Sequence, residues 1–193
     1  MSLRTTARGA TVTIAFLAAA ALAVSASPAS AKISDGYVRG YDAFRGDWSD
    51  EGVLSTTENS VSNAVCLWQT ILWVEGVKET DGTAFDRGDI DGHFGANTKR
   101  ATQHLQAQPG WDLADSWGEA DGRVGPNTFG EADDYLVKSG GFEDRDRTLF
   151  LTYNSGRATF DLYRNASGIY WFKIDDSYPW QAATYASGTT TCD

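Results

Sequence analysis

The chain has 193 residues, with 16 Lys and Arg against 26 Asp and Glu, which gives a formal net charge of −10. A negative field of this size repels the phosphates of nucleic acids and the headgroups of anionic lipids, so neither is an expected partner. The length allows one modest domain or two very small ones. Uncharged glycans and proteins stay open as partners.

The first 31 residues have the pattern of a secretory signal peptide. Arg4 and Arg8 precede an apolar stretch over residues 10–24, and residues 29–31 read ASA, a typical cleavage site. The apolar stretch is shorter than a membrane span, so an uncleaved anchor is the less favoured interpretation. Cleavage would leave 14 basic and 26 acidic residues, a net charge of −12. We therefore expect a secreted protein, extracellular or associated with the cell wall, with no membrane contact after cleavage.

Residues 32–59 show neither helical nor strand periodicity, which predicts an irregular leader, partly wrapped on the domain, or a linker. The first helix is predicted to begin at Ser60 or Ser62 and to end at Gly76, since these residue types favour helix ends. Its apolar residues recur at spacings of three and four: Val61, Val65, Leu67, Trp68, Ile71 and Leu72.

Two octapeptides that start thirty residues apart are the most distinctive feature of the chain. DGHFGANT (91–98) and DGRVGPNT (121–128) share Asp, Gly, Gly, Asn and Thr at matching positions. A calcium loop with Gly92 as its sixth residue would begin at Arg87 and end at Thr98, so both ends lack a carboxylate. A phosphate would meet the carboxylates of Asp91 and Asp121, and GxxxxGK is absent. Metal and anion sites are therefore both disfavoured.

The octapeptides instead predict a device that starts a helix. Asp-Gly favours a tight turn, because Gly tolerates positive φ and Asp bonds to backbone amides two residues on. Phe94 and Val124 are expected to point inward, with the following glycine at the N-cap. Pro126 fits the first helical position, which needs no backbone N–H. The helix after the first copy is predicted to end at Pro109 and the helix after the second at Gly140.

The C-terminal part changes from helical to strand character. RTLFLTYN, RATFDLYR and GIYWFKID are rich in β-branched and aromatic residues and are separated by the turn sequences NSG and NASG. They predict a three-stranded antiparallel meander over residues 147–175, packed on the helices because so small a sheet is not stable alone. The expected organisation is an α+β fold with a helical domain at 60–140 and a β-rich extension at 141–193.

The two cysteines, Cys66 and Cys192, are predicted to form a disulfide. Their number is even, and export places them in an oxidising compartment. The bridge would tie the C-terminal tail to the first helix and close a long loop, which stabilises a fold by roughly 4 kcal/mol on a chain-entropy model. A pair of free thiols is the alternative.

The order of these motifs resembles the peptidoglycan-binding-like domain, a small three-helix module. Its pattern runs V-x-x-L-Q-x-x-L, D-G-x-F-G-x-x-T-x-x-A-V-x-x-F-Q and D-G-x-V-G-P-x-T-x-x-x-L. Here Thr102 replaces an aliphatic residue and the loops before the turns are longer. The resemblance spans residues 65–136 and implies non-catalytic attachment to peptidoglycan, by its glycan strand or stem peptide. The matching residues are Trp68, Gln69, Leu72, Asp91, Gly92, Phe94, Gly95, Thr98, Ala101, Leu105, Gln106, Asp121, Gly122, Val124, Gly125, Pro126 and Thr128.

The sequence does not favour an enzyme, a metal or a cofactor. Zinc hydrolases need about three ligands, and the chain has only His93 and His104. No Gly-x-Ser-x-Gly elbow is present. Trp111 and Trp117, in the polar loop before the second octapeptide, are candidates for stacking on a sugar, with capping of the small core as the alternative for each.

Two other functions remain as alternatives to peptidoglycan binding. A secreted protein-interaction or inhibitory module could use the same fold to bind another cell-envelope protein. Its contact face would be the β-rich tail, with Tyr163, Tyr170 and Trp171 exposed. A small cell-wall hydrolase is less favoured, because the chain outside the helical module is short.

Overall fold

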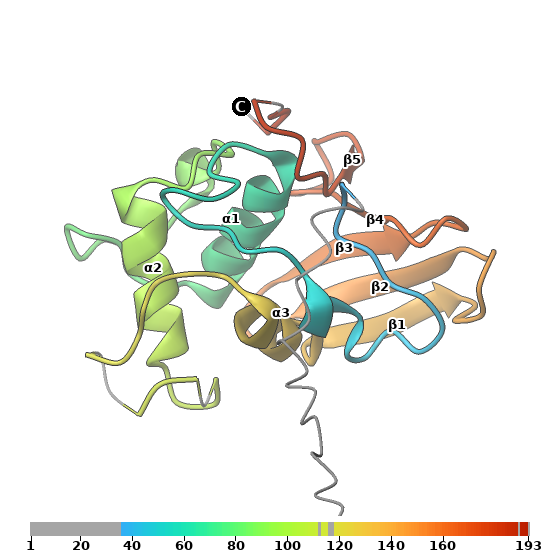
Figure 1. The fold of residues 1–193 in the computed structure, drawn as a ribbon, viewed down its shortest axis with the longest axis horizontal. Helices are drawn as coiled ribbons and strands as arrows, with labels where there is room; N and C mark the ends of the chain where they lie inside the picture. Colours follow the sequence, from blue (N-terminus) through green and yellow to red (C-terminus); the bar gives the residue numbers. More distant parts are fainter. Residues whose placement is uncertain (1–35, 112, 116–117, 189, 193) are drawn as a thin grey trace, which may run out of the picture.

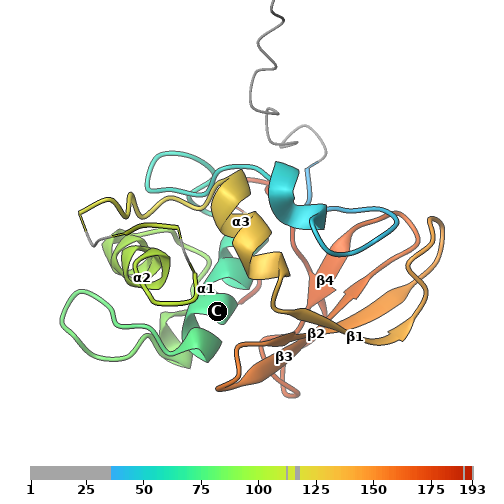
Figure 2. The ribbon, with the colours of Figure 1, turned by 90° about the horizontal axis from the view of Figure 1, so that it is seen from below.

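The computed structural model describes residues 36–111, 113–115, 118–188 and 190–192. Over these residues the fold is α+β: helices lie on one side and an antiparallel sheet on the other (Figures 1 and 2). The expected signal peptide and Trp117 lie outside the described residues. Among the described residues, no helix is long and apolar enough to cross a membrane. The helices are α1 (Asn63–Glu75), α2 (Ala96–Gln106) and α3 (Pro126–Asp133), with short 3-10 turns η2 (Asp47–Asp50) and η3 (Arg87–Asp89).

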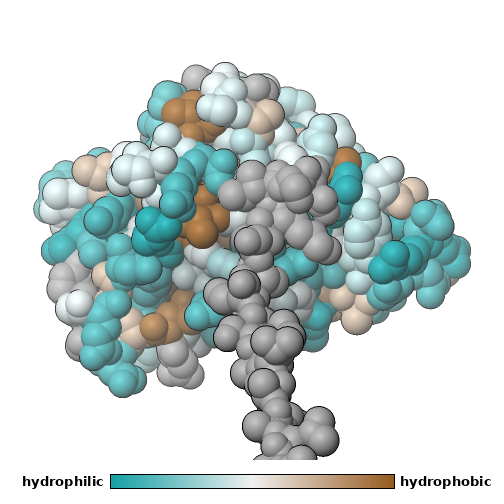
Figure 3. Space-filling view, viewed as in Figure 1, coloured by the Kyte–Doolittle hydropathy of each residue, from teal (hydrophilic) through white to brown (hydrophobic). Residues whose placement is uncertain are grey.

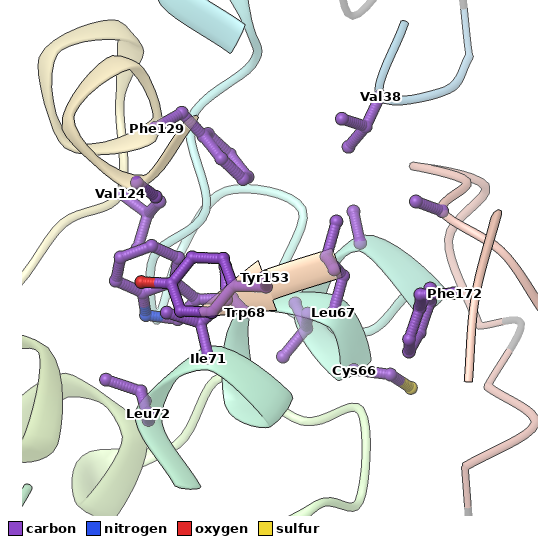
Figure 4. Close-up of a cluster of buried hydrophobic side chains, with 14 of the residues drawn as sticks. Val38, Cys66, Leu67, Trp68, Ile71, Leu72, Val124, Phe129, Tyr153 and Phe172 are labelled. Atoms are coloured by element: carbon purple, nitrogen blue, oxygen red, sulfur yellow. The ribbon is translucent and has the colours of Figure 1, made fainter. Parts of the chain in front are cut away.

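Helix α1 is the centre of the core. Its N-cap is Ser62, whose hydroxyl accepts a hydrogen bond from the N–H of Val65, and its C-cap is Gly76 at φ 65°. All of its residues except Trp73 are buried, because α2 packs on one side while β3 and β5 pack on another. Figure 4 shows Trp68 and Ile71 of this helix among buried side chains from the rest of the fold. Helix α1 is accordingly apolar over most of its circumference, although Gln69 and Glu75 are buried polar residues on it.

The third helix ends earlier than its pattern predicts. The sequence predicts a helix as far as Gly140, but α3 stops at Asp133 and β1 (Leu136–Gly141) begins. Leu136 is fully buried in the strand, so its burial is compatible with either structure. The deciding interactions are distant in sequence: Asp133 accepts hydrogen bonds from the N–H groups of Gly46 and Trp48, and β1 pairs with β2.

The predicted meander is present and forms the centre of a larger sheet. Strands β2 (Leu149–Asn154), β3 (Thr159–Arg164) and β4 (Tyr170–Phe172) run antiparallel, with β1 added at one edge and β5 (Gln181–Ala182) at the other. Alternate residues are buried against the helices, as expected for a sheet with one covered face. The buried strand residues include Leu149, Leu151, Tyr153, Phe160, Leu162, Tyr170 and Phe172.

Residues 36–59, the leader segment, are an integral part of the core. Val38, Trp48 and Leu54 are fully buried. The indole of Trp48 lies edge-on to Phe129 of α3 at 6.1 Å and to Tyr170 of β4 at 5.3 Å between ring centroids. The leader segment therefore fills the space between α3 and the sheet. The face of the molecule in Figure 3, by contrast, is mostly hydrophilic, with small separate apolar areas.

The predicted disulfide between Cys66 and Cys192 is present. It fastens the C-terminal end to α1, where Thr191 also donates its N–H to Oδ1 of Asn63. This connection closes the chain over the central helix, so the end of the tail belongs to the same structural unit as the start of the helical part.

Candidate functional site

The first octapeptide makes a tight turn followed by the start of α2. Gly92 has φ 72°, and Oδ1 of Asp91 accepts a hydrogen bond from the N–H of His93 at 2.8 Å. A Cβ at Gly92 would lie 2.5 Å from Thr190 and 2.9 Å from Sγ of Cys66, so both φ and space require glycine. Phe94 is buried, and Gly95 is the N-cap of α2. The structure thus has a helix start where the sequence predicts one.

Gln69 of α1 holds this turn in place. Its Nε2 donates to Oδ1 of Asp91 at 2.8 Å, to the carbonyl of His93 at 3.1 Å and to Oγ1 of Thr98 at 3.0 Å. Its Oε1 accepts from the N–H groups of Asp91 at 3.1 Å and Gly92 at 2.8 Å. One buried amide therefore satisfies both sides of the turn and the first turn of α2.

Gln106 of α2 holds the second octapeptide in the same way. Its Nε2 donates to Oδ1 of Asp121 at 2.9 Å, to the carbonyl of Arg123 at 3.0 Å and to Oγ1 of Thr128 at 3.3 Å. Its Oε1 accepts from the N–H of Gly122 at 2.9 Å. Gly122 has φ 68°, and α3 begins beyond it with Gly125 at the N-cap and Pro126 at the first helical position. The duplication in sequence is therefore a duplication of structure.

Each copy of the turn borders an open hollow. The first hollow, of about 420 Å³, is lined by Asp91, Asn97 and other residues around the start of α2. The second hollow, of about 370 Å³, is lined by the matching Asp121 and Asn127 around the start of α3. Both Asp and both Asn side chains are exposed. The two hollows differ in their other lining residues. In the first hollow these include Phe85, Asp89 and His93. In the second hollow they include Val53, Leu113, Glu119 and Arg123.

Trp111 does not have the open position that sugar stacking needs. Its side chain is only 1 % exposed. Its ring lies edge-on to Trp68 with centroids 6.2 Å apart, and it stacks on Tyr135 at 5.4 Å with an angle of 17° between planes. The structure therefore corrects the sugar-stacking prediction for Trp111 and supports the alternative role as a cap on the core. Trp117 lies outside the described residues.

An aromatic row lies on the outer face of the sheet; the sequence pointed to Tyr163 and Trp171 in it but not to Phe150 or Trp180. Phe150 pairs with Tyr163, and Tyr163 pairs with Trp171, so the three side chains lie side by side across β2, β3 and β4. Trp180, just before β5, lies edge-on to Tyr163. Tyr170, which was expected to be exposed with Tyr163 and Trp171, is instead fully buried. The alternation of side chains along a strand explains the difference, because Tyr170 and Trp171 are adjacent and therefore face opposite sides of the sheet.

A third hollow, of about 280 Å³, lies beside the buried carboxyls of Asp47 and Glu51. Burial raises the pKa of both carboxyls, and that of Glu51 reaches about 8. Asp47 accepts hydrogen bonds from Arg164 and from the hydroxyl of Tyr170. Glu51 accepts one from the hydroxyl of Tyr185. These carboxyls join the leader segment to the sheet and the tail, so we interpret both as structural.

Among the residues that the structure describes, no group of three or more His, Cys, Asp and Glu side chains is arranged to hold a metal ion. Comparisons of the chain with protein-family models, with curated proteins and with solved structures find no match. The resemblance to the peptidoglycan-binding-like domain therefore stays a prediction, carried by the residues that Gln69 and Gln106 hold together.

Proposed function

We propose that this protein is an exported, non-catalytic module that binds bacterial cell-wall peptidoglycan. The observation that carries the proposal is that one kind of hollow occurs twice. Each copy is formed by an Asp-Gly turn, held by the side-chain amide of a glutamine, and by the start of a helix. A protein with two similar sites suits a polymer that presents the same chemical unit many times, because simultaneous contacts add avidity without new chemistry.

The groups at each hollow suit the uncharged amides of peptidoglycan. An acetamido group or a stem-peptide bond offers one N–H donor and one carbonyl acceptor. The exposed carboxylates of Asp91 and Asp121 accept hydrogen bonds, and the exposed amides of Asn97 and Asn127 both donate and accept them. The acidic character of the chain disfavours the anionic polymers of a cell wall and favours a neutral segment.

The test is sedimentation of the purified protein with isolated peptidoglycan sacculi. The informative variant is Asn97→Ala with Asn127→Ala, because both side chains are exposed at matching positions and their removal leaves the Gln69 and Gln106 contacts intact. Gln108→Ala, an amide removed just beyond the C-terminal end of α2, is the matched control. We expect the wild type and the control to sediment, and the double variant to sediment less than either. Failure of the wild type to sediment would refute the proposal.

A further inference from the structure

The exposed apolar side chains of the described residues gather on and around the sheet. Four large apolar residues are exposed: Val137 and Phe150 on strands, at 49 % and 48 %, Phe142 beside β1 at 50 %, and Trp180 beside β5 at 38 %. No helix carries one of them. Exposed apolar groups that cluster on one element indicate a contact surface more than scattered ones do.

The aromatic row, Phe150, Tyr163, Trp171 and Trp180, crosses the outer face of the sheet. Ring centroids are 6.3 Å apart between Phe150 and Tyr163, 5.9 Å between Tyr163 and Trp171, and 4.8 Å between Tyr163 and Trp180. The planes of Tyr163 and Trp171 differ by only 7°. Paired strands hold three of these rings, so the row is a rigid feature of the fold.

A polar row runs beside the aromatic row. Each of its residues lies two positions along the chain from an aromatic residue of that row. It consists of Thr152 on β2, Asp161 on β3 and Lys173 directly after β4. Oγ1 of Thr152 lies 3.4 Å from Oδ1 of Asp161, and Nζ of Lys173 lies 4.0 Å from Oδ2 of the same carboxylate. The ammonium of Lys173 also lies 5.0 Å from the ring centroid of Trp180. Hydrogen-bonding groups of both kinds therefore stand at fixed places along the aromatic rings.

The two rows together fit a sugar chain better than a protein or an anionic polymer. A pyranose ring has an apolar face of C–H groups and a rim of hydroxyls, which match an aromatic surface bordered by donors and acceptors. Nζ of Lys173 lies between Oδ2 of Asp161 at 4.0 Å and Oδ1 of the exposed Asp176 at 3.1 Å, so two carboxylates surround one ammonium and an anionic ligand is disfavoured. Association of two copies is opposed by their like net charge.

We propose that the outer face of the sheet is a second binding surface, separate from the two hollows, and that it takes a neutral polysaccharide strand. The sugar rings pack on the aromatic row, with Phe150 and Trp180 providing the most accessible rings. The hydroxyls bond to Asp161, Lys173 and Thr152. This surface does not depend on the octapeptides, so it can be present whether or not the hollows bind peptidoglycan.

The test is calorimetric titration of the purified protein with chitohexaose and, separately, with cellohexaose. The two probes distinguish an N-acetylated strand from a plain glucose strand, and binding of either supports the proposal. Trp180→Ala and Phe150→Ala remove exposed rings, so the fold is retained, and each is expected to weaken binding about tenfold, as truncation of a central aromatic contact does. Phe142→Ala removes an equally exposed ring outside the row and is expected to change the affinity less than about twofold.

Three outcomes would overturn this inference. The first is no heat of binding with either oligosaccharide, and the second is a wild-type affinity in both the Trp180→Ala and the Phe150→Ala variant. The third is a dimer in sedimentation velocity that becomes monomeric in Trp180→Ala. The last outcome would assign the face to a second copy of the chain. The sacculus experiment reports on the hollows through Asn97 and Asn127. Failure of the wild type to sediment with sacculi, while oligosaccharide binding is retained, would therefore refute the proposed function alone.

Discussion

Replacement of Gln69 by alanine is the sharpest test of how the repeats are built. The variant loses three donor contacts, which the two N–H groups of Nε2 share, and two accepted hydrogen bonds. Each contributes about 0.5–1.5 kcal/mol net, and those to the exposed Asp91 are replaced by water at little cost. The N–H of the buried Gly92 loses its partner, and the lost side chain leaves a cavity. We expect the free energy of unfolding to fall by about 4 kcal/mol.

The assay is urea denaturation of the oxidised protein at pH 7, with thermal unfolding as a second measurement. A loss of about 4 kcal/mol lowers Tm by roughly 8–16 °C for a chain of this size. Gln103→Ala is the matched control, because this glutamine of α2 donates one bond, to the carbonyl of Ala120, and should cost about 1 kcal/mol. If Gln69→Ala is no more destabilising than Gln103→Ala, Gln69 does not hold the turn.

Gln69→Glu separates hydrogen bonding from packing, since it keeps the size of the side chain. A carboxylate at this position has no N–H to donate and would face Oδ1 of Asp91, which the native Nε2 approaches to 2.8 Å. The variant should therefore be strongly destabilised at pH 7 and partly recover near pH 5, where the added carboxyl takes up a proton. If Gln69→Glu is destabilised relative to wild type by the same amount at pH 7 and at pH 5, packing alone matters.

Three further predictions concern the core. Burial raises the pKa of Glu51 from 4.5 to about 8, so the folded state retains this proton and the free energy of unfolding falls as pH rises between those values. Urea titrations should therefore give a lower free energy of unfolding at pH 8 than at pH 5. Glu51→Gln should remove most of that difference between the two pH values. Reduction of the Cys66–Cys192 bridge should lower the free energy of unfolding by about 2–5 kcal/mol, measured with and without dithiothreitol. Trp111→Ala should cost about 3–5 kcal/mol in urea denaturation, while sacculus binding by the remaining folded protein is unchanged.

Features with local causes could be predicted from the sequence. Ser62 and Gly76 bound α1, and the Asp-Gly turns start α2 and α3, because caps and turns depend on a few adjacent residues. The strands of the tail were recognisable for the same reason, since alternation and turn residues are local signals. The disulfide followed from the count of cysteines and the expected compartment.

Features that depend on distant contacts could not be predicted. The end of α3 is set by Asp133 bonding to the leader segment and by the pairing of Leu136 with Tyr153, neither of which leaves a signal near residue 136. Trp111 lies in a polar stretch, yet Trp68 of α1 and Tyr135, between α3 and β1, enclose it. The aromatic row needed the strand register, which places Phe150, Tyr163 and Trp171 in line.

The two octapeptides and the two glutamines form a sequential structure in which each part sets the position of the next. Gln69 on α1 fixes the first turn, and that turn starts α2. Helix α2 carries Gln106, which fixes the second turn, and that turn starts α3. The placement of α2 is therefore common to both hollows: it forms part of the wall of the first and supplies the amide that shapes the second. A single rigid helix thus sets the separation of the two hollows, which a ligand with a regular repeat would require.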